Sequence, residues 1–105
     1  MPDSSLIDPL GRTIRLHQNT WSIHIVPGHP ELANHRHLVE SAIVNPLIIT
    51  HSRSDLACRL YHGPGPRPEV TITVVVDVVR RLVKTAHLVR KVSATETVKW
   101  SLQTP

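Results

Sequence analysis

The sequence predicts an α+β domain in which an N-terminal helical segment, with one short and one longer helix, packs on a roughly four-stranded antiparallel sheet. A chain of 105 residues has room for one hydrophobic core. Apolar residues recur at helical spacing in its first half, and branched residues gather in short runs between turns in its second half. We therefore expect residues 1–105 to form a single domain, with residues 1–10 as a flexible N-terminus.

The first predicted elements are a strand and a short helix. Residues 8–11 (Asp-Pro-Leu-Gly) have the composition of a turn, and polar and apolar residues then alternate over residues 12–16 as in an edge strand. Thr20 is placed to cap a short helical turn, which Pro27 and Gly28 would close.

The longer helix is predicted to begin at Pro30 and to end at Asn45-Pro46. Proline suits the first helical position, and the carboxylate of Glu31 suits the positive end of the helix dipole. Apolar residues then recur at roughly helical spacing, at Leu32, Leu38, Val39, Ala42 and Ile43.

The second half of the chain predicts strands that form an antiparallel meander against the longer helix. A proline-rich loop over residues 63–68 and a turn at Arg80-Arg81 separate the runs of branched residues. The predicted strands lie over residues 47–50, 56–62, 70–79, 82–89 and 97–102.

Charge and cysteine content narrow the class of partner. Twelve Lys and Arg against eight Asp and Glu give a net charge of +4, which favours a polyanion such as nucleic acid.

Cys58 is the only cysteine, so no disulfide can form within the chain, and it is expected to be an inert buried thiol. The N-terminus lacks the pattern of a signal peptide, and no apolar run is long enough to span a membrane. We expect a cytoplasmic protein with no membrane partner.

Eight histidines among 105 residues are the most unusual feature of the composition. Cleavage of RNA without a metal needs a base for the 2′-hydroxyl, an acid for the departing 5′-oxygen and a cation for the phosphorane. Histidine suits the first two roles because its unperturbed pKa is about 6.5. Arginine or lysine suits the third.

His24 and His29 lie on either side of a predicted junction between two helices. His29 precedes Pro30, at a point where the unpaired amides of a helix would face a phosphate. The alternative is that His24 packs between Trp21 and the sheet while His29 only caps the helix. His35 and His37 point to different faces of the helix and are interpreted as solvated surface residues. No zinc-binding motif accompanies these histidines, and neither a metal nor a cofactor is expected.

Two further groups of residues lie on predicted strands. Arg59 and Tyr61 are two apart and would share a strand face, where they could hold a phosphate. The alternative is a solvent-facing Arg59 over a half-buried Tyr61. On the next candidate strand Thr85 and His87 share one face, and Lys84 lies on the other.

The order of these motifs resembles the phage-associated branch of the BECR nucleases, a superfamily that includes barnase, EndoU, colicin-type toxins and RelE. The resemblance spans roughly residues 11–90 and is most specific in Trp21-x-x-His24-Ile25 and His29-Pro30-Glu31-Leu32. It implies an N-terminal helical part on a four-stranded antiparallel sheet, and cofactor-free RNA cleavage on the sheet face. It implies acid–base roles for His24 and His29, phosphate binding by Arg59 and a hydrogen-bonding role for Thr85. We further expect His87 to be catalytic, and Trp21, Tyr61 and Lys84 to contact the substrate. Relatives carry Ile-Thr-Ala-Tyr where this chain has Lys84-Thr85-Ala86-His87, so His87 could replace the tyrosine as proton donor.

Two classes of function follow. The first is a toxin-like, metal-independent endoribonuclease whose partners are RNA, with tRNA as one candidate, and an antitoxin or immunity protein. The second is a non-catalytic basic interaction protein of phage or mobile-element origin that binds nucleic acid or a host protein. It would bind in a salt-dependent manner without forming product. A metal-dependent hydrolase would instead carry stoichiometric zinc and lose activity to a chelator.

Overall fold

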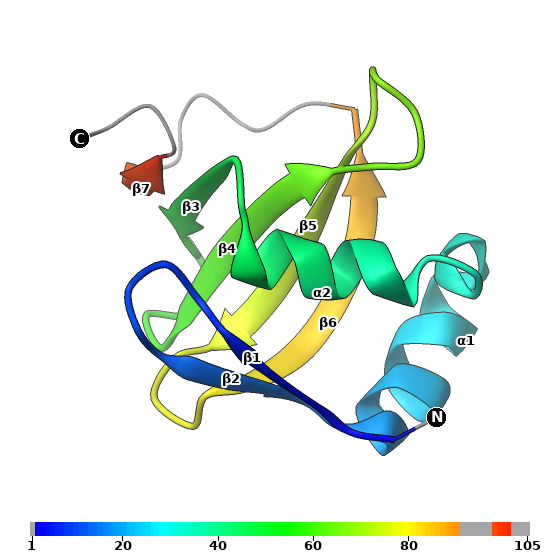
Figure 1. The fold of residues 1–105 in the computed structure, drawn as a ribbon, viewed down its shortest axis with the longest axis horizontal. Coiled ribbons are helices and arrows are strands. Elements are labelled where there is room, and N and C mark those ends of the chain that lie inside the picture. The colour runs from blue at the N-terminus through cyan, green and yellow to red at the C-terminus, as the bar shows by residue number, and fades with distance from the viewer. Residues whose placement is uncertain (1, 91–97, 102–105) are drawn as a thin grey trace.

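Two helical segments and one mixed sheet make up the part of the chain that the computed structural model describes, residues 2–90 and 98–101. The strands lie side by side in the order β1-β2-β6-β5-β4-β3-β7 (Figure 1). The α+β prediction is therefore confirmed, but the sheet has more strands than four, and the helices follow β1 and β2 instead of forming the N-terminus. Their bounds are β1 Ser4–Ile7, β2 Thr13–Leu16, β3 Ile48–His51, β4 Cys58–Pro64, β5 Thr71–Asp77, β6 Leu82–Val89 and β7 Val98–Ser101.

The antiparallel meander is confirmed for β3, β4, β5 and β6, each of which pairs with the next. The sheet is nevertheless mixed, because β2 runs parallel to β6, with Arg15 beside Leu82. Pairing of this kind joins segments far apart in the chain, and local sequence patterns carry no signal for it.

The prediction that residues 1–10 are flexible is wrong for β1, which pairs antiparallel with β2. The hairpin forms because the Asp8 carboxylate accepts hydrogen bonds from the backbone N–H groups of Leu10 (3.0 Å) and Arg12 (2.8 Å). Since β1 lies outside β2, the strand predicted as an edge is an inner strand of the sheet.

The short helix is confirmed, but it begins before Thr20. Asn19 already has helical backbone angles, and residues 18–28 form one helical segment whose parts are a π-helical stretch, η1 (Thr20–Ile25), and α1 (Val26–Gly28). The wide turn precedes Pro27, whose ring would meet the carbonyl of Ile23 in a regular α-helix. Thr20 therefore lies inside the helix and is not its cap.

The longer predicted helix is interrupted. Pro30–Leu32 forms a single 3₁₀ turn, η2, and the α-helix α2 spans only Arg36–Val44. Tight backbone hydrogen bonds, from Leu32 N to His29 O and from His35 N to Leu32 O, turn the chain between them. This break lets Leu32 reach the core, where it is fully buried.

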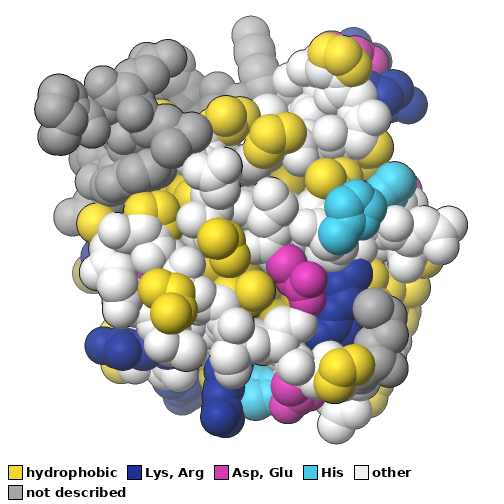
Figure 2. Space-filling view, in the orientation of Figure 1, with side chains coloured by type: hydrophobic (Ala, Val, Ile, Leu, Met, Phe, Trp, Pro, Cys, Tyr) yellow, Lys and Arg dark blue, Asp and Glu magenta, His cyan; other side chains and the backbone are white. Residues whose placement is uncertain are grey.

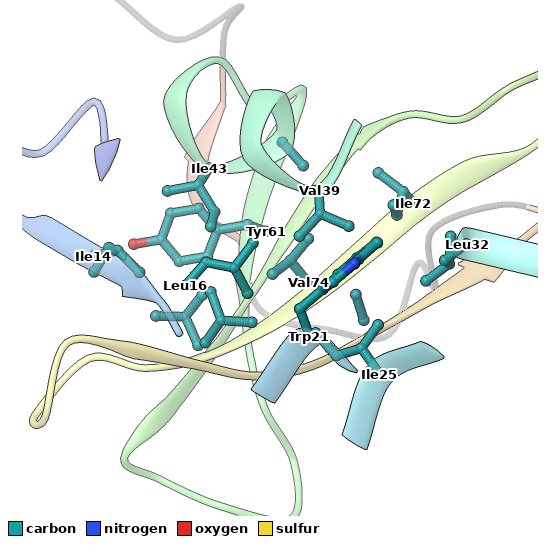
Figure 3. Close-up of a cluster of buried hydrophobic side chains, with 14 of the residues drawn as sticks. Ile14, Leu16, Trp21, Ile25, Leu32, Val39, Ile43, Tyr61, Ile72 and Val74 are labelled. Carbon is teal, nitrogen blue, oxygen red and sulfur yellow. The ribbon is translucent and has the colours of Figure 1, made fainter. Parts of the chain in front are cut away.

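The core lies between α2, the N-terminal helical segment and one face of the sheet (Figure 3). Ile14 and Leu16 enter it from β2, and Val39 and Ile43 enter it from α2. Gly63 on β4 lies so close to α2 that a Cβ there would be 2.8 Å from the Cβ of Ala42. The absence of a side chain at Gly63 thus sets how closely the helix approaches the sheet.

Arg36 at the start of α2 is buried and ties three elements together. Its guanidinium donates to Gln18 Oε1 (2.7 Å), to the Pro2 carbonyl (2.6 Å) and to Ser4 Oγ (3.0 Å). Its Nε also pairs with Glu40 at 3.2 Å. The network joins β1 and the start of the helical segment to α2, and it fixes the N-terminal residues in the fold.

None of the helices among residues 2–90 has the length and hydropathy needed to cross a membrane.

Candidate functional site

Two predicted histidines from distant parts of the chain lie together beside β6. His29 leaves the helical segment with non-helical backbone angles (φ −139°, ψ 72°), and its N–H still donates to the Ile25 carbonyl at 2.8 Å. His87 lies near the end of β6 and is paired with Thr73. The two imidazole rings have centroids 5.9 Å apart. Because η1 packs against β6, the helical segment carries His29 to this strand.

Glu31 completes this group, which we call the His29–His87 site. Its Oε2 lies 3.6 Å from His29 Nδ1, close enough to pair with the protonated ring. From the sequence, Glu31 was expected only to stabilise the positive end of a helix dipole. The tight turn through Pro30 brings its carboxylate back towards His29, and the His-Pro-Glu spacing is the signal that could have identified it.

Burial lowers the pKa of His87, and the positive charge of a protonated His29 lowers it further, while Glu31 opposes the shift. The His87 ring is therefore neutral near pH 7 and able to accept a proton. A neutral His87 can accept a proton, and a His29 ring that faces the Glu31 carboxylate can donate one when it is protonated. The two rings are therefore suited to act as general base and general acid.

Thr85 lies two residues before His87 and by strand alternation shares its face. The pairing of β5 with β6 shifts between Val75 and Val76, which leaves Lys84 as an extra residue in β6. The Lys84 ammonium is half exposed and lies 3.5 Å from Asp55 Oδ2. Thr85 is thus oriented like His87, whereas Lys84 is paired with a carboxylate on another loop.

The other two predicted catalytic residues lie elsewhere. His24 is exposed on η1, and within residues 2–90 no hydrogen bond, ion pair or ring contact joins its side chain to His29 or His87. Arg59 donates to the carbonyl oxygens of Leu56 (2.9 Å) and Cys58 (3.0 Å). It is opposite Val76, which pairs with the start of β6 and not with the end that carries His87.

Trp21 and Tyr61, expected to contact substrate, are both core residues. Trp21 is 4% exposed and packs beside Arg36, whose guanidinium lies 5.8 Å from a ring centroid. The Tyr61 hydroxyl donates to Asp8 and accepts from Arg12 at 3.0 Å. Arg59 and Tyr61 share a strand face, as predicted, but their polar atoms have different partners, so they do not form a phosphate cradle.

A buried polar cluster lies next to His87 on the same side of the sheet. His62 on β4 is 3% exposed, and its ring nitrogens are each 2.9 Å from a threonine hydroxyl, those of Thr50 and Thr73. Thr73 is the cross-strand partner of both His62 and His87. The cluster links three adjacent strands, and its Thr73 lies beside His87 in the strand register. Sequence reasoning missed it, because it depends on strand register.

His35 is half-buried at the start of α2, and His37 is exposed. His37 lines a hollow of about 270 Å³ together with Ala33, Asn34, Arg36 and Glu40. Among the described residues, no three His, Cys, Asp or Glu side chains are placed to hold one metal ion. Cys58 is buried, as expected, and burial raises the pKa of its thiol.

Comparisons of this chain with family models, curated proteins and solved structures gave no match.

Proposed function

We propose that this chain is a metal-independent endoribonuclease in which His29 and His87 are the acid–base pair. The observation that carries the proposal is the meeting of these two rings, 5.9 Å apart, from two separate elements and beside Glu31. The basic charge of the chain and its resemblance to the BECR nucleases support an RNA substrate.

The proposed reaction is a transesterification. The base takes the proton of a ribose 2′-hydroxyl while the 2′-oxygen forms a bond to the adjacent phosphorus. The bond from phosphorus to the 5′-oxygen breaks, and the acid protonates that oxygen as it leaves. The products are a 2′,3′-cyclic phosphate and a free 5′-hydroxyl, so no co-reactant is consumed.

We assign the base to His87 and the acid to His29. A base must be neutral before the reaction, and burial and the His29 charge lower the pKa of His87. An acid must carry a proton, and Glu31 Oε2 at 3.6 Å is placed to pair with protonated His29.

Charge on the phosphorane would be balanced by protonated His29 and by a hydrogen bond from Thr85, which shares the face of His87. Arg59 is not assigned this role, because its guanidinium binds two carbonyl oxygens beside the other end of β6. Tyr61 and Trp21 are likewise assigned to the core and not to the substrate.

The test is incubation of the purified protein with total RNA and a labelled tRNA pool in the presence of EDTA. His29→Ala and His87→Ala are each expected to slow cleavage by about 10² to 10⁴. His24→Ala is the matched control, because it removes an exposed histidine of the same helical segment and should retain wild-type activity. Circular dichroism checks that every variant is folded.

Cleavage that is lost equally in His24→Ala would contradict the assignment of the pair. Cleavage that EDTA abolishes would contradict the metal-independent mechanism. Intact RNA at high protein concentration, with salt-dependent binding, would instead favour the non-catalytic interaction protein. Cleavage that behaves as proposed would make an antitoxin or immunity protein the expected partner, and that partner should block the His29–His87 site.

A further inference from the structure

One end of the sheet gathers most of the cationic side chains of β2, β4 and β6. The turn between β5 and β6 and the loop between β3 and β4 meet there, because Asp77 is paired with both Cys58 and Leu82. Arg15 also lies beside Leu82. We call this region the basic end; its cations are Arg15, Arg53, Arg59, Arg80, Arg81 and Lys84.

Two carboxylates at the basic end pair with two of its cations. Asp55 pairs with Lys84 at 3.5 Å, and Asp77 lies 4.0 Å from Arg80 Nε. Among the residues that the structure describes, Arg59 and Arg81 form no ion pair. Figure 2 shows Lys and Arg side chains at the lower left edge of the molecule, where Figure 1 places the β5–β6 turn.

Arg81 has a backbone conformation that does not suit arginine. Its φ is +60°, the left-handed region, and no other non-glycine residue among those described has a positive φ. Its carbonyl accepts a hydrogen bond from Arg15 N at 2.9 Å, which a glycine could do equally well. The exposed side chain of Arg81 packs in no core, so neither the turn nor the packing accounts for an arginine here.

We propose that the basic end binds backbone phosphates of a single-stranded RNA that continues along β6 to the His29–His87 site. This inference rests on the proposed function. Arg81 precedes His87 by roughly 20 Å of strand at about 3.3 Å per residue, so it contacts phosphates several nucleotides from the cleaved bond. The Arg81 guanidinium, which has no carboxylate partner among the described residues, suits phosphate oxygens, and Thr85 lies on β6 between Arg81 and His87.

The test measures binding of a fluorescent 2′-O-methyl RNA oligonucleotide, which has no free 2′-hydroxyl and cannot be cleaved, over a series of salt concentrations. Arg81→Gly is expected to weaken binding about fivefold at 0.1 M salt and to reduce the salt slope by about 0.7. Its thermal midpoint should be no lower than wild type, because glycine accepts the left-handed conformation. The matched control is Arg67→Gly, which removes one exposed arginine from the loop between β4 and β5 at the other end of the sheet.

Wild-type affinity in Arg81→Gly would overturn the proposal, as would an equal loss in Arg67→Gly, which would mean that only net charge matters. Displacement of the RNA by an equally charged polyglutamate would overturn the assignment to RNA and indicate an acidic protein partner. Binding that depends on Arg81, in a wild-type protein that cleaves no RNA, would uphold the basic end and refute the endoribonuclease. A third result is also distinguishable: wild type cleaves RNA, His87→Ala does not, and Arg81→Gly binds RNA like wild type. This result would uphold the endoribonuclease and refute the basic end.

Discussion

The imidazole rings of His29 and His87 lie 5.9 Å apart, one at the end of the N-terminal helical segment and the other on β6. Neither residue is held by a hydrogen bond to the other, so their separation is set by the packing of η1 against β6. Any change that shifts this segment relative to the strand should therefore alter the site without touching either histidine.

The pH dependence of cleavage should report His87. Its pKa is lowered from 6.5 by burial and by the charge of His29, so the rate should rise with pH through a midpoint below 6.5 as the base becomes neutral. The Glu31→Gln variant removes the opposing carboxylate and should move this midpoint lower still. Rate–pH profiles of the two proteins on one short RNA would test this; a midpoint that moves upward in Glu31→Gln would contradict it.

Asp8→Asn should destabilise the protein by about 3 kcal/mol at pH 7, because it breaks a buried charged pair. Burial opposes ionisation of Asp8, but hydrogen bonds from Tyr61 and Arg12 outweigh it and lower the carboxyl pKa below 3.8. A lowered pKa stabilises the fold above the unfolded value of 3.8, and this contribution is lost as pH falls through the folded value. Urea unfolding from pH 7 to pH 2 should show the difference between the two proteins shrinking below about pH 4.

The exposed Asp3 provides the control for this experiment. The Asp3 carboxylate accepts a hydrogen bond from Gln18 N and lies 3.1 Å from His17 Nδ1. Asp3→Asn should nevertheless lower the free energy of unfolding far less than Asp8→Asn, because water screens these exposed contacts. Equal losses in the two variants would mean that the Asp8 network contributes nothing beyond a surface pair.

Arg36→Ala should lower the free energy of unfolding by about 3 to 5 kcal/mol, because Gln18 Oε1 and the Pro2 carbonyl lose their donor and Glu40 keeps only the Ser4 hydroxyl. Arg36→Lys should recover only part of this, since one ammonium cannot reach all four acceptors. Hydrogen exchange should show the loss first in β1, whose Ser4 is held by this guanidinium. Protection of β1 equal to wild type in Arg36→Ala would contradict the role of Arg36 in holding the N-terminus.

Gly63→Ala should destabilise the fold by about 1 to 3 kcal/mol through overpacking. The new methyl group would lie 2.8 Å from Ala42 Cβ and 2.9 Å from its Cα, so α2 would have to move away from the sheet. Gly28→Ala is the control, because a Cβ there meets nothing within 4 Å. Thermal melts of the two variants should differ by several degrees, with Gly28→Ala close to wild type.

The sequence alone determined which segments are strands in the second half of the chain. The strands β3, β5 and β6 are short and contain branched residues between turns, and β4 follows the loose alternation of residues 56–62, so local preference and final structure agree. The turn at Arg80-Arg81 and the short helix ending near Gly28 were predictable for the same reason. In contrast, β1 has only four residues, and it forms because Asp8 and Arg36 hold it in place from outside.

Only the tertiary structure decided which polar residues meet. Arg59 and Tyr61 share a strand face, as strand alternation requires. The Tyr61 side chain is nevertheless buried in the core, where its hydroxyl is hydrogen-bonded to Asp8 and Arg12. His24 and His29 lie in one helical segment, yet only His29, at its end, meets His87. Helix and strand periods describe where residues lie within one element. A site between two elements depends on how those elements pack, so no pattern within either segment encodes the distance between His29 and His87.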